Sequence, residues 1–268
     1  MAFTESNKAR IARRVIEVLE FFDEDHPQAT VMDIVRRFDR PQSSTSELLS
    51  NLVGLGLLYK DRQTRSYSLT PRAAMLGNAV QPGIIRDGRL VGLMDRLSAQ
   101  TGLGVGIFGM VGLNVQVYGW CNGKPPLRTA NPAGVRSGQQ ESLTDSAAGL
   151  LLLSTVAQPN RDGMIRRLNA EAAPERRFAF ADVSARVQQC REQGYAIGVA
   201  GFGSIADMTA VLLPGLPENQ PLAIGFLYEP SDQIDAETLL HSLQDAVARS
   251  VGSEQLEPAS VQRLFNAA

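Results

Sequence analysis

The sequence predicts an α+β protein built from two domains of ordinary size. The chain has 268 residues, of which 44% are hydrophobic and 20% are charged, as in a well-packed globular protein. The first 70 residues show three helical stripes of apolar residues and then two short strand patterns. After residue 101, apolar strand patterns alternate with amphipathic helices, which is typical of a mixed α/β domain.

Three helices are expected to open the first domain. Residues 11–22 place their large apolar side chains on one face and charged side chains opposite. Thr30 is the expected N-cap of a second helix, because Asp33 follows three residues later, and Pro41 ends that helix. The Ser-Thr-Ser-Glu sequence at residues 44–47 fits a capping box, which predicts the start of a third helix.

A hairpin is expected to complete the first domain. Residues 57–60 and 66–70 have strand patterns, and the polar residues 61–65 join them. Three helices followed by a hairpin form a winged helix-turn-helix, in which the third helix enters the DNA major groove and the hairpin contacts the flanking backbone. The sequence therefore predicts a DNA-binding domain over residues 1–72.

Local charge supports DNA binding, although the whole chain has a net charge of -2. Residues 36–72 carry seven basic residues and three acidic ones, and neutralising phosphates requires such a local excess. Hydroxyl and amide groups at a helix start can bond to base edges, but each serine alone could simply cap the helix and each arginine could simply stay solvated. The predicted DNA contacts are Arg36, Arg37, Arg40, Gln42, Ser43, Ser44, Thr45, Ser46, Ser50, Lys60, Arg62 and Arg65.

The second part of the chain is expected to consist of a linker, an α/β domain and a tail. The linker covers residues 73–101 and contains a helix from about residue 84 to 100, and a weakly tied tail covers residues 253–268. The α/β domain spans residues 102–252. Its expected strands are 103–111, 114–118, 206–213 and 222–228, and its expected helices are 145–157, 161–170, 180–193 and 236–251.

Cysteine and histidine usage argues against a metal site or cofactor chemistry. Cys121 and Cys190 lie far apart in the sequence, and His26 and His241 have no partner motif beside them. These four residues predict neither a zinc site nor a disulfide framework, and they favour a reducing compartment. The polar N-terminus has no signal-peptide core, and the longest apolar run is too short to span a bilayer. We therefore expect a soluble cytoplasmic protein without a membrane partner.

Two alternative functions stay open at this point. An enzyme could use the GxGxxG match at residues 104–109, but a dinucleotide fingerprint follows a strand and opens a helix, whereas these glycines lie inside an apolar strand pattern. Without a placed histidine, a Ser-His-Asp arrangement also lacks its base. The other alternative is a constitutive DNA-binding repressor without a ligand.

Several segments resemble the IclR family of bacterial transcriptional regulators. Residues 30–44, TVMDIVRRFDRPQSS, and 48–58, LLSNLVGLGLL, resemble that family's second helix, turn and recognition helix. The wing reads RSYSLTPR from residue 65. Residues 142–153, SLTDSAAGLLLL, and 191–196, REQGYA, resemble motifs of the family's C-terminal domain. The sequence departs from the family where Ser46 and Glu47 replace a common histidine and arginine, and where Leu150 replaces a common lysine.

The resemblance implies a GAF-like effector-binding domain and a homodimer or homotetramer. It also implies a double-stranded DNA operator, a small-molecule effector and, as the expected role, repression of a catabolic operon. The ligand pocket implied by the resemblance is lined by Asp145, Ser146, Ala147, Gly149, Ser204, Phe226 and Tyr228. Since Phe226 and Tyr228 would fill a pocket built for a short keto acid, we expect a larger, more apolar effector of aromatic type. The alternative is that both residues simply belong to the core side of a strand.

Overall fold

The computed structural model describes residues 7–23, 26–78, 81–130, 134–217, 219–231 and 234–252. The chain divides into two compact units, Met1–Gln81 and Pro82–Ala268. The predicted tail at residues 253–268 lies outside the described residues. Each unit has its own apolar core, so each is described by itself below.

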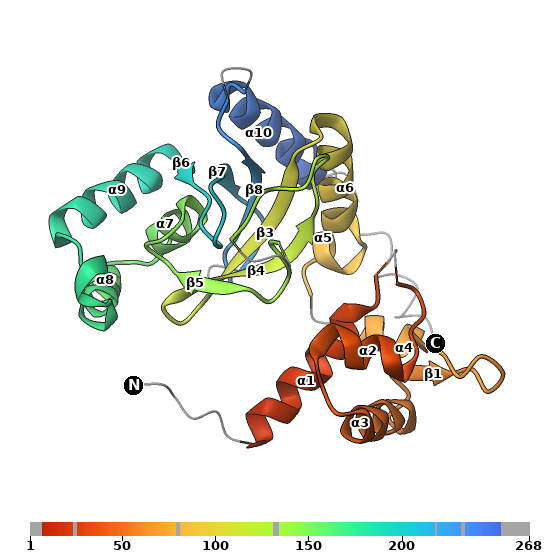
Figure 1. The fold of residues 1–268 in the computed structure, drawn as a ribbon. Coiled ribbons are helices and arrows are strands. Elements are labelled where there is room, and N and C mark those ends of the chain that lie inside the picture. The colour runs from red at the N-terminus through yellow and green to blue at the C-terminus, as the bar shows by residue number, and fades with distance from the viewer. Residues whose placement is uncertain are drawn as a thin grey trace, which may run out of the picture. The chain divides into compact units, whose positions relative to one another are not determined.

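The first unit contains the predicted three helices and hairpin (Figure 1). In chain order its elements are α1 (Asn7–Phe21), α2 (Val31–Phe38), α3 (Gln42–Gly54), β1 (Leu58–Lys60), β2 (Tyr67–Leu69) and α4 (Pro71–Met75). The two strands pair antiparallel, with Tyr59 opposite Ser68. The core joins all three long helices to the hairpin through Val18, Ile34, Leu49, Leu52, Leu58 and Tyr67.

Local sequence explains the turn between α2 and α3. Thr30 forms the predicted capping box with Asp33, and Asp39 ends α2 in the left-handed conformation. The predicted start of α3 is wrong, because the helix begins at Gln42 with Pro41 at its N-cap and no side-chain cap. Ser44 therefore lies inside the first turn instead of capping the helix.

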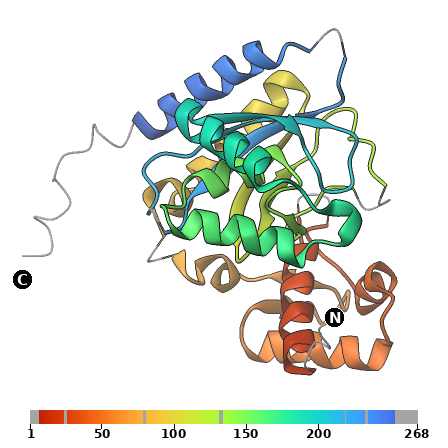
Figure 2. The same cartoon turned by 90° about the vertical axis from the view of Figure 1, so that its left-hand side faces the viewer.

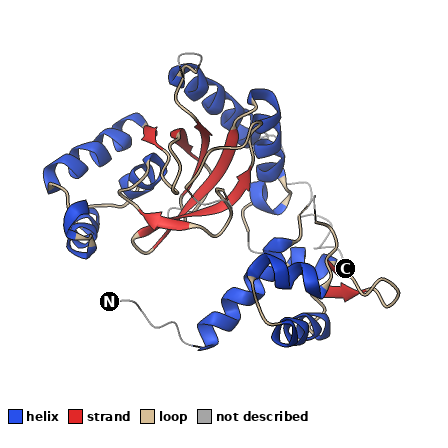
Figure 3. Cartoon of the chain, in the orientation of Figure 1, coloured by secondary structure: helices blue, strands red, loops and turns tan. Residues whose placement is uncertain are grey.

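The second unit is built on a six-stranded antiparallel sheet, shown in red in Figure 3. The strands run in the order β5-β4-β3-β8-β7-β6, so the last strand of the chain lies in the middle of the sheet. Their bounds are β3 (Gly104–Val111), β4 (Asn114–Cys121), β5 (Gln140–Ser142), β6 (Tyr195–Val199), β7 (Asp207–Leu212) and β8 (Leu222–Tyr228). This α/β architecture fits the predicted GAF-like fold.

Helices cover both faces of this sheet. Helices α5 (Gly83–Arg86), α6 (Arg89–Thr101) and α10 (Ala236–Gly252) build one core with Ile107, Ile224 and Phe226. On the other face lie α7 (Ala147–Ser154), α8 (Asn160–Glu171) and α9 (Phe180–Gln193), and in Figure 2 the green α8 and the teal α9 lie in front of the sheet. Phe108 and Leu227 belong to this second core.

The structure adds two strands and divides one helix. β5 lies between the strand expected at residues 114–118 and the helix expected at residues 145–157, where no strand was predicted, and β6 follows α9 directly. The helix expected over about residues 84–100 is broken by Gly88, which takes the left-handed conformation before α6 begins. α6 packs against β3 and α10, so it is part of the second unit's core.

Candidate nucleic-acid interface and ligand site

The first two to three turns of α3 present polar side chains to solvent. Gln42, Ser43 and Ser50 are exposed, and Ser44 and Ser46 are half-buried. The Ser50 hydroxyl donates to the carbonyl of Ser46 at 2.8 Å, which leaves its oxygen free to accept a further bond. These five side chains form one accessible polar surface along the helix that a helix-turn-helix inserts into DNA.

Thr45 does not belong to this surface. It is 3% exposed, and its hydroxyl donates to the carbonyl of Pro41 at 2.9 Å. The Ser44 hydroxyl points to the same carbonyl at 3.2 Å. The structure therefore gives Thr45 a role in closing the first turn of α3, where its hydroxyl is buried and already donates to Pro41.

The arginines of α2 and of the turn after it have two different environments. Arg36 and Arg37 are exposed, and Arg36 has only a loose contact with Asp33 at 3.9 Å. Arg40 is half-buried, forms an ion pair with Glu17 of α1 and lies over the Phe38 ring at 5.1 Å. Arg36 and Arg37 are thus free to neutralise phosphates, whereas Arg40 ties α1 to the turn before α3.

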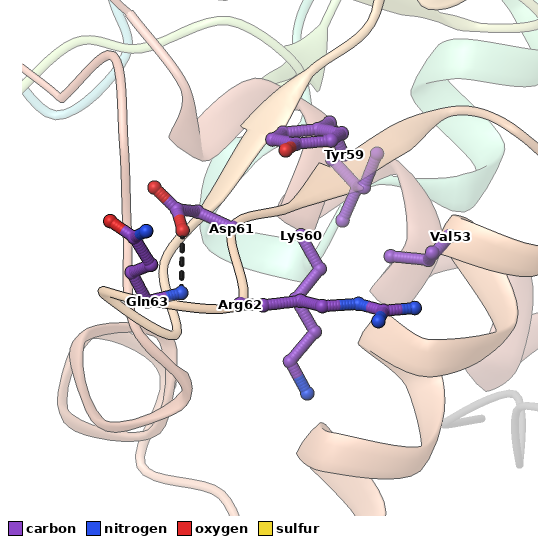
Figure 4. Close-up of a pocket in the computed structure, with 7 residues that line it drawn as sticks. Val53, Tyr59, Lys60, Asp61, Arg62 and Gln63 are labelled. Carbon is purple, nitrogen blue, oxygen red and sulfur yellow. Dashed lines mark hydrogen bonds between the residues drawn. The ribbon is translucent and has the colours of Figure 1, made fainter.

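The hairpin carries the remaining basic residues, and a groove lies between the hairpin and α3 (Figure 4). Val53 of α3 and residues 58–63 of the hairpin line this groove. Asp61 accepts hydrogen bonds from the backbone N–H groups of Gln63 and Thr64, and these bonds lower the pKa of its carboxyl. In Figure 4 the charged ends of Lys60 and Arg62 point away from this carboxylate, and the Lys60 ammonium lies over the Tyr67 ring, 5.3 Å from its centroid.

Arg65 lies at the end of the same turn with a φ of 58°. A left-handed backbone is unusual for arginine and sets the direction of the chain into β2. Its side chain is exposed, as are those of Lys60 and Arg62. The hairpin therefore presents three cations at one end of the first unit.

The predicted ligand segment around the start of α7 is tightly packed. Ser146 is fully buried, and its hydroxyl oxygen accepts the N–H of Gly149 at 3.3 Å as the helix cap. A Cβ on Gly149 would lie 2.2 Å from the carbonyl oxygen of Leu143, so only glycine fits there. Asp145 is half-buried and accepts a hydrogen bond from Arg176 at 2.5 Å. Ala147 is also buried, which leaves Asp145 as the accessible polar group of the segment.

Phe226 and Tyr228 do not lie with this segment. Both belong to the core under α6 and α10, on the opposite face of the sheet from α7. The hydroxyl groups of Tyr228 and Thr209 lie 3.0 Å apart, and burial raises the pKa of Tyr228. The alternation of side chains along β8 turns Leu227 toward α7 instead. The expectation that the two aromatic residues share a pocket with Asp145 is therefore corrected.

Ser204 lies in the loop between β6 and β7, where its hydroxyl donates to the carbonyl of Gly201 at 2.7 Å. The same loop carries Phe202, whose N–H donates to the Glu141 carboxylate. Sequence reasoning missed Glu141, because one glutamate in a loop rich in glycine and serine has no pattern. Gly201 was its only signal, since a Cβ at this position would lie 1.9 Å from Oε1 of Glu141 and glycine can mark such a close backbone approach.

Among the described residues, no helix is long and apolar enough to cross a membrane. Within the same residues, no three histidine, cysteine or carboxylate side chains gather as metal ligands would.

Comparisons with known proteins agree with this arrangement. Residues 12–62, which include α2, α3 and the first strand of the hairpin, match the model of the IclR helix-turn-helix domain. The chain is 25% identical over 244 residues to the HTH-type transcriptional regulator TsaQ1/TsaQ2 of Comamonas testosteroni, covering 90% of this chain and 86% of that protein.

Solved structures share the fold over nearly the whole chain. An IclR homolog from Microbacterium hydrocarbonoxydans, complexed with 4-hydroxybenzoate, matches with a TM-score of 0.58 and 17% identity, covering 90% of this chain and 97% of that one. The IclR transcriptional regulator from Alicyclobacillus acidocaldarius matches with a TM-score of 0.55 and 20% identity over the same shares. The chain thus contains a segment that matches the IclR helix-turn-helix domain, it is similar over most of its length to a transcriptional regulator, and it shares the fold of solved IclR proteins.

Proposed function

We propose that the chain regulates transcription by binding an operator through α3 and the hairpin. The accessible polar row on α3 carries this proposal. In it, Gln42, Ser43 and Ser50 read base edges, while Arg36, Arg37 and the three hairpin cations neutralise phosphates. Thr45 and Arg40 hold the reading surface in shape and do not contact DNA.

The second unit binds the small-molecule effector in this proposal. Its support is the IclR homolog of Microbacterium hydrocarbonoxydans, which is complexed with 4-hydroxybenzoate. Asp145, Ser146 and the loop of Ser204 lie on the α7 side of the sheet and surround the proposed site. The segment 73–101 transmits the ligand's effect from the domain at residues 102–252 to the DNA-binding domain at residues 1–72.

We further propose that the regulator is a cytoplasmic homodimer or homotetramer that represses a catabolic operon. Two copies of α3 would enter successive major grooves of a roughly palindromic site. A ligand changes operator affinity only if it prefers one arrangement of the two DNA-binding domains.

A binding role for the second unit is favoured over an enzymatic one. The glycines at 104, 106 and 109 lie inside β3, where Trp120, Phe108 and Tyr118 occupy the space that side chains at these positions would need. This packing supports a structural role for the glycine pattern and gives no phosphate cradle. A constitutive repressor without an effector can be distinguished from this proposal by experiment, because no metabolite would change the stability of such a protein.

A combined binding experiment tests the proposal. Fluorescence anisotropy with DNA from upstream of the protein's own gene measures operator binding, and thermal shift with candidate metabolites measures ligand binding. The proposal expects salt-sensitive, sequence-specific DNA binding and at least one metabolite that raises the melting temperature and alters DNA affinity. Failure to bind both that DNA and a random genomic pool would contradict the regulator role.

A further inference from the structure

The groove between α3 and the hairpin continues the accessible polar surface of α3. Ser46, Ser50 and Val53 follow one another at intervals of four and three residues, so they lie on one face of the helix. Val53 is half-buried and lines the groove together with Tyr59 of β1. The groove has a volume of about 820 Å³, far more than a single water molecule or ion fills. The surface that we assign to base reading therefore leads directly into a groove for a larger occupant.

The hairpin side of this groove carries an aromatic side chain that does not contribute to the core of the first unit. Leu58 and Tyr67 are 2% and 1% exposed, whereas Tyr59 is 62% exposed. The alternation of side chains along β1 turns Leu58 toward the core and Tyr59 away from it. Tyr59 thus offers an apolar ring face and a phenol hydroxyl, which can donate a hydrogen bond, at the edge of the groove (Figure 4).

The charged residues of the groove favour an anionic occupant. Lys60 and Arg62 line it and are exposed, and in Figure 4 the Arg62 side chain extends toward the α3 side of the groove. Asp61 also lines the groove, but its carboxylate accepts the backbone N–H groups of Gln63 at 2.7 Å and of Thr64 at 3.3 Å. This carboxylate is therefore engaged by its own turn. The groove thus combines apolar side chains with two exposed cations.

We propose that this groove seats one sugar–phosphate strand of the operator and that Tyr59 is a DNA-contacting residue. The Tyr59 hydroxyl donates to a phosphate oxygen, its ring and Val53 pack on the adjoining deoxyribose, and Arg62 neutralises the next phosphate.

A sugar–phosphate strand suits this groove because it alternates apolar and anionic groups, as the groove alternates apolar and cationic ones. Continuity with the base-reading surface of α3 favours DNA over an acidic peptide. The inference rests on the proposed operator binding and adds an uncharged contact to it. Since salt dependence comes from the release of counterions by cations, the Tyr59 contact contributes affinity without contributing to the salt slope.

Fluorescence anisotropy of the full-length protein with the upstream DNA, across a salt series, tests this contact. Tyr59→Phe removes only the hydroxyl, so affinity should fall about tenfold, as for a lost bond to a charged group. The slope of log affinity against log salt should stay that of the wild type, whereas Arg62→Ala should make it shallower by about 1. Tyr118→Phe is the matched control, because it removes the hydroxyl of a tyrosine that is 50% exposed on β4 of the second unit. It should bind DNA like the wild type.

Hydroxyl-radical footprinting on the same DNA tests the placement of the strand. This reagent reports how accessible each deoxyribose is, so a strand seated in the groove is protected. Tyr59→Val removes the ring and the hydroxyl but keeps a side chain that suits a strand. It should lose protection of a short run of sugars beside the half-site and keep protection within it. Both Tyr59 variants should melt like the wild type, since the position is exposed.

Wild-type affinity in Tyr59→Phe, or an unchanged footprint in Tyr59→Val, would overturn the groove assignment. The cations of α2 separate this failure from failure of the regulator role. If Arg36→Ala/Arg37→Ala shows a shallower salt slope while Tyr59→Phe binds like the wild type, only the groove assignment is wrong. If the wild type binds neither the upstream DNA nor a random genomic pool, the regulator role and the groove assignment are both wrong.

Discussion

Two arginines close together in the sequence have different roles in the structure. Arg40 packs over Phe38 and pairs with Glu17, whereas Arg37 is exposed. Arg40→Ala should lower the free energy of unfolding by about 1–2 kcal/mol, because it removes a half-buried ion pair and a cation–π contact. Chemical denaturation measures this change. If the variant were as stable as the wild type, the Glu17 pair would not hold α1.

Arg37→Ala is the matched control and should behave in the opposite way. Its unfolding free energy should stay within about 0.5 kcal/mol of the wild type, as for an exposed substitution. Its DNA affinity should fall similarly for all sequences, and the slope of log affinity against log salt should become shallower by about 1. A stability loss without a DNA effect would show that Arg37 is structural.

Glu141 should make stability depend on pH. Its pKa is raised to about 7 by burial, whereas an unfolded glutamate titrates near 4.5. Between these values the folded state binds more protons than the unfolded state, so stability falls as pH rises from about 4.5 to 7 and then levels off. The loss should be about 1–3 kcal/mol and absent in Glu141→Gln. Urea denaturation across this range checks it, and equal profiles for both proteins would contradict a raised pKa.

At the scale of elements, α7 depends on a glycine that touches another segment. In Gly149→Ala the new methyl would meet the Leu143 carbonyl at 2.2 Å, so we expect a loss of about 2–3 kcal/mol from overpacking. Gly163→Ala in α8 is the matched control, because nothing lies within 4 Å of its Cβ position. It should leave stability unchanged or raise it by up to about 1 kcal/mol. Thermal unfolding of both variants distinguishes a packing effect from a helix-propensity effect.

Strong periodicity made most elements predictable from the sequence. α9 and β8 have the predicted bounds, because each has a long regular pattern with turn residues on both sides. β5 and β6 were missed because three residues, or five with an internal glycine, give too short an alternation. α3 begins before its predicted serine cap because Pro41 already supplies a suitable N-cap backbone.

The candidate sites were harder to predict, since they depend on tertiary packing. The basic hairpin and the exposed start of α3 follow from local sequence. The burial of Thr45 depends on how α3 packs, and the face on which Phe226 lies depends on strand register. Glu141 meets Phe202 across 61 residues of sequence, and no local pattern links them.

At the scale of the whole molecule, the two units have separate cores and different chemistry. The chain has a net charge of -2, yet α2 and the hairpin of the first unit present the exposed cations Arg36, Arg37, Lys60, Arg62 and Arg65. The second unit offers acceptor groups around the 201–203 loop. This division suits a regulator in which one unit binds an anionic polymer and the other senses a small molecule.

The most direct test of the regulator role is fluorescence anisotropy with upstream DNA across a salt series. The wild type should bind specifically and weaken steeply with salt, and Arg36→Ala/Arg37→Ala should show a slope shallower by about 2. Gln42→Ala should keep the wild-type slope but lose sequence preference. Equal slopes for the wild type and the arginine variant, or binding that ignores salt, would contradict DNA recognition by this surface.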